Sequence, residues 1–347
     1  MKKLFTIVFA VSLCSCASLR KSTTDTPMPE AIRIWDRAPH NAFTDLLRFR
    51  NAFYCVFREA SAHVYGTDGK IQVLRSADGK SWHSIAVLEK AGTDLRDPKI
   101  SVTPQGKLMI LMGGSVYRGK VLVDGQTHVS FSDETGSRFS APRPVKLGPG
   151  LPPSGNWIWR VTWHKGTGYA IDYQAGTGDR KDRTACYLLR TTDGQTFERM
   201  SRLEVDGFPN ESTIRFDQHD EMYVLIRRDL GDQKGVLARS RPPYRDWAYQ
   251  KLDIRLGGPN FIFLGKDRIC MASRLYASEG GKDHFYTALF VTDTLGRVRK
   301  TVRLPSGGDN SYPGLVSYRG KLWVSYYSSH EKNTAIYLAR VPLKELR

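Results

Sequence analysis

Residues 73–82 (VLRSADGKSW) decide the fold, because an apolar strand runs there into an Asp-Gly turn and an aromatic residue follows. Residues 188–197 (LLRTTDGQTF) repeat this pattern almost position for position. The aspartate of such a turn can accept hydrogen bonds from backbone N–H groups of its own turn, and glycine supplies the positive φ where the chain reverses. Each stretch therefore predicts a β-hairpin whose aromatic side chain packs back over the turn.

Weaker copies of this hairpin recur along the chain. They occupy residues 129–139, 237–247 and 290–296. The equivalent positions of all five copies are Asp78, Asp133, Asp193, Ser240 and Asp293. These positions are 55, 60, 47 and 53 residues apart. Such a period, with several short strands in each unit, is the signature of propeller blades, so the sequence predicts an all-β, six-bladed β-propeller.

The blades are expected at residues 42–93, 97–147, 156–205, 208–254, 257–304 and 311–343. Residues 32–35 are expected to close the ring by pairing with the last blade. The composition agrees with this interpretation. Apolar residues make up 40 % of the 347 residues, enough for a sizeable core, and the 31 glycines, 16 tyrosines and 7 tryptophans favour turns and strands over helices.

The first residues are expected to be an export signal. Lys2 and Lys3 precede an apolar run of ten residues (LFTIVFAVSL), which has the length of a signal-peptide core and is too short to span a bilayer. Cys16 follows in a context that resembles the bacterial lipobox. We therefore expect a lipoprotein signal peptide at 1–15, lipidation of Cys16, a polar tether at 16–30 and one propeller domain at 31–347. An ordinary secretory signal is the alternative. A lipid-anchored chain of this kind is expected at the outer membrane, on its periplasmic or cell-surface face.

Charge and cysteine content narrow the partners. The formal net charge of +17 favours acidic partners, and acidic glycans suit an exported protein better than nucleic acid, because no helical basic stripe is present. Cys55, Cys186 and Cys270 each lie in an apolar, strand-like stretch and are expected to be buried free thiols. No cluster has metal-ligand spacing, so neither a metal nor another cofactor is predicted, and the chain is expected to be a monomer.

The Asp-Gly hairpins resemble the Asp boxes of sialidases, written S-x-D-x-G-x-x-W, in a form that lacks the residue between Asp and Gly. Asp boxes also occur in non-enzymatic propellers, so a resemblance in chemistry depends on two other stretches. Residues 209–214 (PNESTI) with 225–228 (LIRR) look like the segment that carries the catalytic glutamate and a substrate-binding arginine. Residues 308–315 (GDNSYPGL) are similar to the last sialidase blade, which carries the nucleophilic tyrosine. The resemblance implies that Tyr312 is the nucleophile, Glu211 its base partner and Arg227 a carboxylate ligand.

This pairing has a chemical reason. A phenol with a pKa near 10 is a poor nucleophile at neutral pH, so a neighbouring carboxylate must take its proton during attack. A tyrosine also avoids the charge repulsion that a carboxylate nucleophile would meet at an anomeric carbon bearing a carboxylate. Sialidases depart from the usual pair of catalytic carboxylates in this way.

The chain departs from the sialidase pattern at two places. In sialidases an arginine opens the first blade and belongs to a clamp of three, but residues 40–47 (HNAFTDLL) have none, and Ala42 stands near the vacant position. The general acid is expected in the loop 58–68, where Asp68 is the only aspartate and His63 is an equally suitable acid by type.

Further candidates lie at strand ends. His40 opens the first blade and could take part in catalysis, as histidines do in related propeller enzymes that act on uronate-linked sugars. The candidate substrate-binding residues are Arg96, Asp97, Trp159, Arg160, Arg227, Arg274 and Tyr276. Arginines there can meet an anion, and aromatics can stack on sugar faces.

Three functions follow from these patterns. The first is a sialidase-like exo-glycoside hydrolase that removes an acidic terminal sugar. The second is a hydrolase or lyase that uses His40 and His63 on a uronate-linked sugar. The third is a glycan-binding propeller without catalysis, which the missing arginine of the first blade favours.

Overall fold

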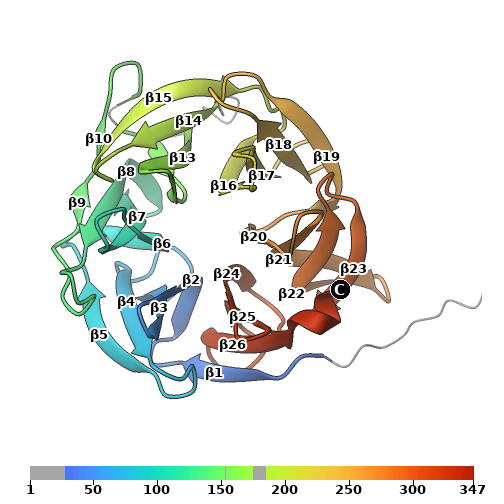
Figure 1. Cartoon of the computed structure of the whole chain (residues 1–347). Helices are drawn as coiled ribbons and strands as arrows, with labels where there is room; N and C mark the ends of the chain where they lie inside the picture. The colour runs from blue at the N-terminus through green and yellow to red at the C-terminus, as the bar shows by residue number, and fades with distance from the viewer. Residues whose placement is uncertain (1–27, 153, 175–184) are drawn as a thin grey trace, which may run out of the picture.

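The computed structural model describes residues 28–152, 154–174 and 185–347 (Figure 1). The chain forms a ring of six β-sheets, and each sheet is one blade of a β-propeller (Figure 1). The predicted signal peptide, Cys16 and most of the tether lie outside the described residues and stay predictions. In the described ranges no helix is long and apolar enough to cross a bilayer.

Each blade begins at the ring axis and ends at the rim. The first consists of β2 (His40–Phe49), β3 (Ala52–Ala60), β4 (Lys70–Ser76) and β5 (His83–Leu88). The second consists of β6 (Asp94–Val102), β7 (Leu108–Arg118), β8 (Val121–Phe131) and β9 (Arg143–Pro144). The third contains β10 (Lys146–Leu147), β11 (Asn156–Ile158), β12 (Thr162–His164), β13 (Thr167–Gln174), β14 (Cys186–Thr191) and β15 (Thr196–Leu203).

The other three blades follow the same plan. The fourth consists of β16 (Pro209–Phe216), β17 (Met222–Arg228), β18 (Lys234–Ser240) and β19 (Ala248–Arg255). The fifth consists of β20 (Asn260–Phe263), β21 (Arg268–Glu279), β22 (Lys282–Asp293) and β23 (Val298–Arg303). The sixth consists of β24 (Asn310–Tyr318), β25 (Lys321–Ser328), β26 (Ala335–Pro342) and β1 (Ala31–Trp35), and a short 3-10 helix, η1 (Leu343–Leu346), ends the chain.

The predicted fold is therefore confirmed, and the expected blades agree closely with the observed sheets. The predicted ring closure is also confirmed, because β1 pairs with β26 in the sheet order β1-β26-β25-β24. This pairing joins the first described strand of the chain to its last one.

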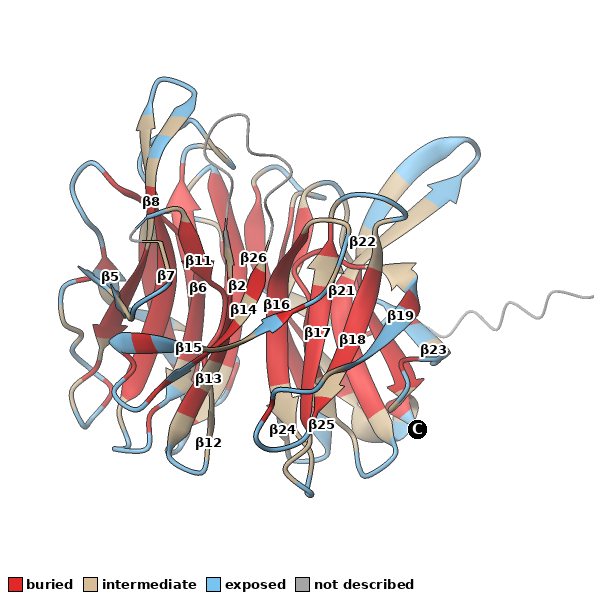
Figure 2. Ribbon diagram, turned by 90° about the horizontal axis from the view of Figure 1, so that it is seen from above, coloured by how far each residue is buried: buried red, intermediate tan, exposed pale blue. Residues whose placement is uncertain are grey.

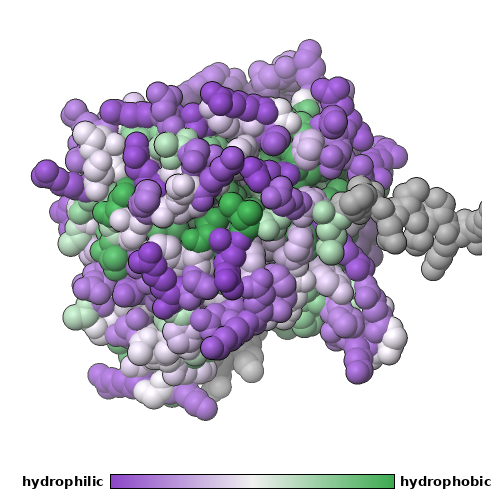
Figure 3. All heavy atoms as spheres, turned by 90° about the horizontal axis from the view of Figure 1, so that it is seen from below, coloured by the Kyte–Doolittle hydropathy of each residue, from purple (hydrophilic) through white to green (hydrophobic). Residues whose placement is uncertain are grey.

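The core consists of one apolar cluster at each of the six blade interfaces (Figure 2). Alternate side chains of each sheet face the neighbouring blade on either side, so most central strands are buried along their length. Cys55, Cys186 and Cys270 lie in these clusters as buried free thiols, as predicted. Figure 3 shows one side of the ring, which is largely hydrophilic with only small apolar patches.

The Asp-Gly hairpins connect neighbouring blades. Asp78 Oδ1 accepts the backbone N–H groups of Lys80 (2.8 Å) and Ser81 (2.9 Å), and these bonds lower the pKa of Asp78 to about 2. A Cβ on Gly79, whose φ is +73°, would lie 2.4 Å from the indole of Trp323 in the sixth blade. The turn at Asp193 has the same pair of backbone bonds, and its glycine lies against the second blade. Each turn therefore packs on the blade that precedes it around the ring.

The innermost strands of four blades each carry one extra residue near their first end. In each case an advance of three residues along the inner strand corresponds to an advance of two residues along its partner. The bulges lie between Ala42 and Asp45, Arg96 and Lys99, Pro209 and Ser212, and Ser311 and Gly314. A bulge of this kind changes the direction of the side chains beside it.

Three of these bulges hold a non-glycine residue in the left-handed region. Phe43, Asp97 and Tyr312 occupy equivalent places, with φ of 63°, 50° and 52°. Such backbone costs a non-glycine residue about 1–2 kcal/mol, and residues held there gather at functional sites. Because this strain recurs at one end of the ring, a functional site is expected at that end.

Two long hairpins project from this end. The pairing of β7 with β8 continues to Arg118 and Val121, past the first residue of β6, and that of β21 with β22 continues to Glu279 and Lys282, past the first residue of β20. Both hairpins stand out from the ring in the side view (Figure 2). They flank the surface onto which the bulges open.

Candidate active site

Three of the predicted site residues meet at the bulged end of the ring. The Tyr312 hydroxyl donates to Glu211 Oε1 at 2.5 Å, although the two residues are 101 positions apart in the sequence. Arg227 Nη1 lies 2.8 Å from the same carboxylate oxygen and 3.2 Å from the Tyr312 hydroxyl. We call Tyr312, Glu211 and Arg227 the tyrosine cluster.

The surroundings of this cluster keep a negative charge on Glu211 and a proton on Tyr312. Burial alone would raise the pKa of Glu211, but Arg227, the Tyr312 hydroxyl and the backbone N–H of Gly258 hold it below its ordinary value. Burial and the charge of Glu211 raise the pKa of Tyr312 well above its ordinary value. The pair is therefore a carboxylate that accepts a hydrogen bond from a protonated phenol.

A second cluster lies beside the first and is centred on Asp309. Its Oδ2 is 3.1 Å from His40 Nε2 and 2.7 Å from His63 Nδ1. Its Oδ1 accepts the Tyr327 hydroxyl at 2.8 Å and lies 3.3 Å from Arg274 Nη2. We call these five residues the histidine cluster. It contains three predicted residues (His40, His63 and Arg274) together with Asp309 and Tyr327, which the sequence analysis did not single out.

Phe43 contacts both clusters. Its ring centroid is 5.1 Å from that of Tyr312 and 5.0 Å from that of His63, and the side chain is 1 % exposed. The sequence analysis placed the vacant arginine position near Ala42. Ala42 and Phe43 are both buried in one apolar cluster, and of the two it is Phe43, in the bulge, whose ring contacts His63 and Tyr312. The aromatic ring of Phe43 thus occupies the position where the first blade contacts the site.

Two predicted binding residues lie too deep to meet a ligand from the surface. Arg160 is 6 % exposed and its Nη1 pairs with Asp45 Oδ2 at 2.6 Å. Trp159 is 2 % exposed, and its ring lies against Tyr312 and beneath the ammonium group of Lys99. The prediction assumed that side chains at the start of the third blade point outward, but here they pack beneath Tyr312. Both residues support the site from below.

Arg96 and Asp97 also belong to the supporting layer. Arg96 is 9 % exposed and donates to the carbonyl of His63 at 3.0 Å, so it holds the backbone of a site residue. Asp97 is buried between Arg96 and Lys99, and burial raises the pKa of its carboxyl group. Burial lowers the pKa of the Lys99 amine to about 8.

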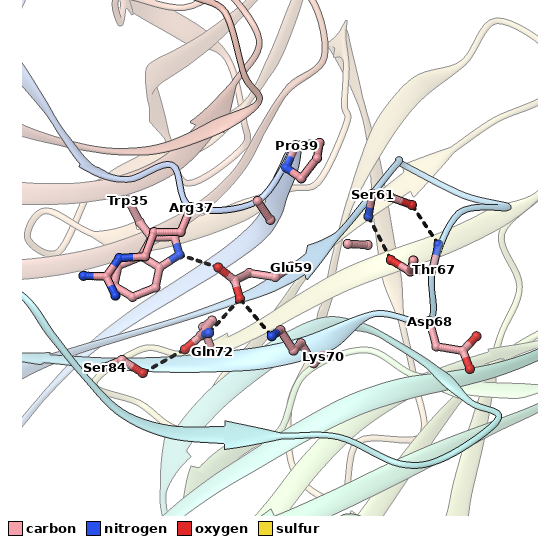
Figure 4. A pocket seen from close by; sticks show the side chains of 12 residues that line it. Trp35, Arg37, Pro39, Glu59, Ser61, Thr67, Asp68, Lys70, Gln72 and Ser84 are labelled. Atoms are coloured by element: carbon pink, nitrogen blue, oxygen red, sulfur yellow. Dashed lines mark hydrogen bonds and ion pairs between the residues drawn. The ribbon is translucent and has the colours of Figure 1, made fainter.

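Asp68 lies in a different pocket. It lines a cavity of about 530 Å³ together with Trp35, Arg37 and Glu59, between the closing strand β1 and the first blade (Figure 4). No hydrogen bond or ion pair joins the Asp68 carboxylate to another residue that the structure describes. Of the two acids proposed from the sequence, His63 is the one in contact with the site. Tyr276 stands at the base of the projecting β21–β22 hairpin, where Arg255 covers its ring at 4.0 Å.

The histidine cluster also contains the donor atoms for a metal ion. One atom from each of His40, His63 and Asp309 lies within 4.8 Å of the others. A set of two imidazoles and a carboxylate suits zinc or iron by type. Arg274, which shares Asp309, opposes a further positive charge there.

Fold and site together define a sialidase-like six-bladed β-propeller with a tyrosine–glutamate pair at one end of its axis. No protein-family profile and no curated protein sequence matches the chain. Among solved structures, it is similar to a protein of unknown function from Dyadobacter fermentans, with a TM-score of 0.75 and 16 % identity over 90 % of this chain and 98 % of that one.

Two enzymes are also similar in structure. A Penicillium chrysogenum α-L-arabinanase in complex with arabinobiose has a TM-score of 0.68 and 14 % identity, over 92 % of this chain and 99 % of that one. A Trypanosoma rangeli sialidase has a TM-score of 0.65 and 14 % identity, over 92 % of this chain. The present chain spans only 60 % of that sialidase. At these identities the comparisons establish the propeller fold, which the chain shares with glycoside hydrolases.

Proposed function

We propose that the protein is a glycoside hydrolase that removes a terminal acidic sugar, with Tyr312 as the nucleophile and Glu211 as its base. The observation that carries the proposal is the 2.5 Å hydrogen bond from the Tyr312 hydroxyl to a buried carboxylate that Arg227 also binds. A phenol placed in this way can lose its proton at the moment of attack, which is what a tyrosine nucleophile requires.

The first half of the reaction balances as follows. The Tyr312 oxygen forms a bond to the anomeric carbon while its proton passes to Glu211. The bond from that carbon to the leaving oxygen breaks, and the leaving oxygen takes up a proton from a second group. Water then attacks the anomeric carbon and gives one of its protons to the second group. The glycosyl–tyrosine bond breaks, Glu211 returns its proton to the Tyr312 oxygen, and the sugar is released with a new hydroxyl group.

Charge in the site favours an acidic sugar. Arg227 and Arg274 both reach the opening, with side chains 18 % and 19 % exposed. Each can turn part of its guanidinium toward a carboxylate, a geometry to which arginine is well suited. The net charge of +17 would also attract an anionic glycan at long range.

A fluorinated acidic sugar tests the proposal directly. Aryl glycosides of sialic acid, of a related keto-deoxy acid and of glucuronic acid are first screened for release of the aryl group. The protein is then incubated with the cleaved sugar carrying fluorine on its anomeric carbon and on the neighbouring carbon, which is the 2,3-difluoro form for either keto acid and 2-deoxy-2-fluoroglucuronyl fluoride for glucuronic acid. One solved sialidase neighbour is a covalent intermediate with 2,3-difluorosialic acid. We expect the mass of one sugar to be added on Tyr312. Failure of all three screens, or a Tyr312→Phe variant with full activity, would contradict the proposal.

The histidine cluster supports one alternative, cleavage of a uronate-linked sugar by elimination. His63 is exposed, and the ring of Phe43 contacts both His63 and Tyr312. His63 could therefore act as a base on such a substrate. Elimination produces an unsaturated uronate that absorbs ultraviolet light, whereas hydrolysis does not. Product absorbance therefore separates the two reactions.

A further inference from the structure

We infer that His63 is the acid that protonates the leaving oxygen, and that Asp309 is the positioning residue that aims it. This inference rests on the proposed hydrolase function and adds the proton donor that the tyrosine cluster lacks. It is carried by the contacts of His63, which is exposed at its ring but fixed at its backbone.

The loop that carries His63 is held by two arginines. Arg58 donates to the carbonyl of Ala62 at 2.9 Å, and Arg96 donates to the carbonyl of His63 at 3.0 Å. Both guanidinium groups contact the carboxylate of Asp94, and Arg58 is completely buried. Surface loops seldom have a buried support of this kind. The two arginines fix the loop that carries His63 as firmly as a strand is fixed in a sheet.

Asp309 determines which nitrogen of His63 is free. Its Oδ2 lies 2.7 Å from Nδ1, so the proton on Nδ1 is directed to the carboxylate. The other ring nitrogen, Nε2, makes no hydrogen bond to a described residue, and the side chain is 48 % exposed. Nε2 is therefore the nitrogen that can give its proton to a bound substrate.

His40 and His63 share the carboxylate but differ in burial. His40 is 6 % exposed, and burial lowers its pKa despite the hydrogen bond to Asp309. The two rings are 5.3 Å apart, so two imidazolium ions would repel each other. Burial therefore favours the neutral form of His40. The groups that face His63 from the surrounding elements are Asp309, His40, Arg96, Asp97, Arg274 and Tyr327.

The histidine cluster is better suited to proton donation than to binding a metal ion. If His40 bound a metal through Nε2, its Nδ1 would carry a hydrogen, and that buried atom has no partner among the described residues. Histidines that bind metals almost always donate their other N–H group to an acceptor. With Nε2–H donated to Asp309, Nδ1 is a bare acceptor, which is less costly to leave unpaired.

The proton balance of the proposed step is complete. The imidazolium of His63 gives the proton on Nε2 to the leaving oxygen as the glycosidic bond breaks, and His63 becomes neutral. In the second half the same nitrogen takes a proton from the attacking water, which restores the imidazolium.

Leaving-group dependence tests this role. An aryl glycoside has an acidic leaving group that departs without a proton, whereas the methyl glycoside of the same sugar requires one. We expect His63→Ala to lower kcat/KM for the methyl glycoside by about 10²–10⁴-fold and for the aryl glycoside by less than about 10-fold. Asp309→Asn should lower kcat/KM for the two substrates in the same pattern, with smaller losses. In this variant the alkaline limb of the pH profile of kcat/KM should move to lower pH.

Asp68→Asn is the matched control, because Asp68 is the other acid of the same loop and lies in a separate pocket. Its activity should equal that of the wild type on both substrates. Equal losses on both substrates in His63→Ala would overturn the role of His63 while leaving Tyr312 as the nucleophile. If EDTA abolished activity and Zn²⁺ restored it, the cluster would hold a catalytic metal ion and the role of His63 as proton donor would be overturned.

A spectroscopic measurement is independent of turnover. In protein labelled with ¹⁵N-histidine, His63 should carry its neutral-form proton on Nδ1 in the wild type. In Asp309→Asn this preference should be lost. An unchanged tautomer in the variant would show that Asp309 does not position His63.

Discussion

The tyrosine cluster and the histidine cluster both contact Phe43 but are built differently. The members of the first stand on strands β16, β17 and β24, and its carboxylate, Glu211, is buried. The second brings together His63, from the loop after β3, and Asp309, from the residue before β24. The comparison teaches that strand ends can fix side chains beside the axis, whereas a side chain that must reach the solvent needs a loop with its own buried support.

The largest expected effect separates the clusters by substrate. Glu211→Gln should lower kcat/KM by about 10²–10⁴-fold on aryl and methyl glycosides alike, because Glu211 acts on the nucleophile and not on the leaving group. Steady-state kinetics on both substrates measure this. Glu198→Gln, at an exposed ion pair in the third blade, is the control and should keep full activity. A loss confined to the methyl glycoside would assign Glu211 to the other cluster.

Phe43→Ala should remove a side chain that contacts both clusters. Phe43 is 1 % exposed and touches the rings of His63 and Tyr312, so its truncation should cost about 3–5 kcal/mol of the free energy of unfolding. Urea denaturation measures this loss. Phe285→Ala on the projecting hairpin, 37 % exposed, should cost about 1 kcal/mol or less. Similar losses in the two variants would show that Phe43 is not a shared packing element.

The charge of Asp309 should appear in the acid dependence of stability. Burial alone would raise the pKa of Asp309, but hydrogen bonds from His40 and His63 hold it well below its ordinary value. Its stabilisation is therefore present above the unfolded-state pKa of about 3.9 and is lost as the pH falls below it. Asp309→Asn should remove on the order of 2 kcal/mol from the difference in unfolding free energy between pH 6 and pH 2. The exposed Asp253→Asn variant should keep the full difference.

The smallest expected effect concerns the buried histidine. His40→Gln retains an N–H donor for Asp309, so activity on the methyl glycoside at pH 7 should stay within about threefold. Because the pKa of His40 is lowered, the wild type loses stability as the pH falls below about 6.5, where the unfolded chain takes up a proton. The variant should lose less stability between pH 7 and pH 5, as thermal denaturation would show. A larger activity loss in His40→Gln than in His63→Ala would exchange the roles of the two histidines.

Most of the fold was readable from the sequence because blade repeats are local. The Asp-Gly turn at 78–79 and its copies depend only on neighbouring residues, so their spacing gave the number and limits of the blades. The pairing of Tyr312 with Glu211 could also be predicted, since each lies in a stretch that resembles a sialidase segment. Both residues open an inner strand, and the inner strands meet at the axis.

The roles of Asp309, Tyr327 and Phe43 could not be predicted, because they depend on ring closure and on bulges. Asp309 lies 269 residues from His40 in the sequence, and it had the appearance of a turn residue beside Gly308. Phe43 contacts Tyr312 and His63 from a bulge, in which one extra residue interrupts β2 after Ala42. Arg160 shows the opposite error, since a charged residue at a strand end is here satisfied by a buried partner, Asp45. The one available signal for Asp309 was its place in the stretch 308–315, three residues before Tyr312.

The repeated bulges have an evolutionary consequence. Each one absorbs a local change in direction, so the strand below it keeps its register whichever side chain stands at the opening. Residues at the mouth of the ring can then be exchanged one at a time, without loss of the barrel of inner strands that carries them. Natural selection can thus vary the chemistry of the ring while inheriting its architecture unchanged, and rings of this shape accordingly include both a sialidase and an arabinanase.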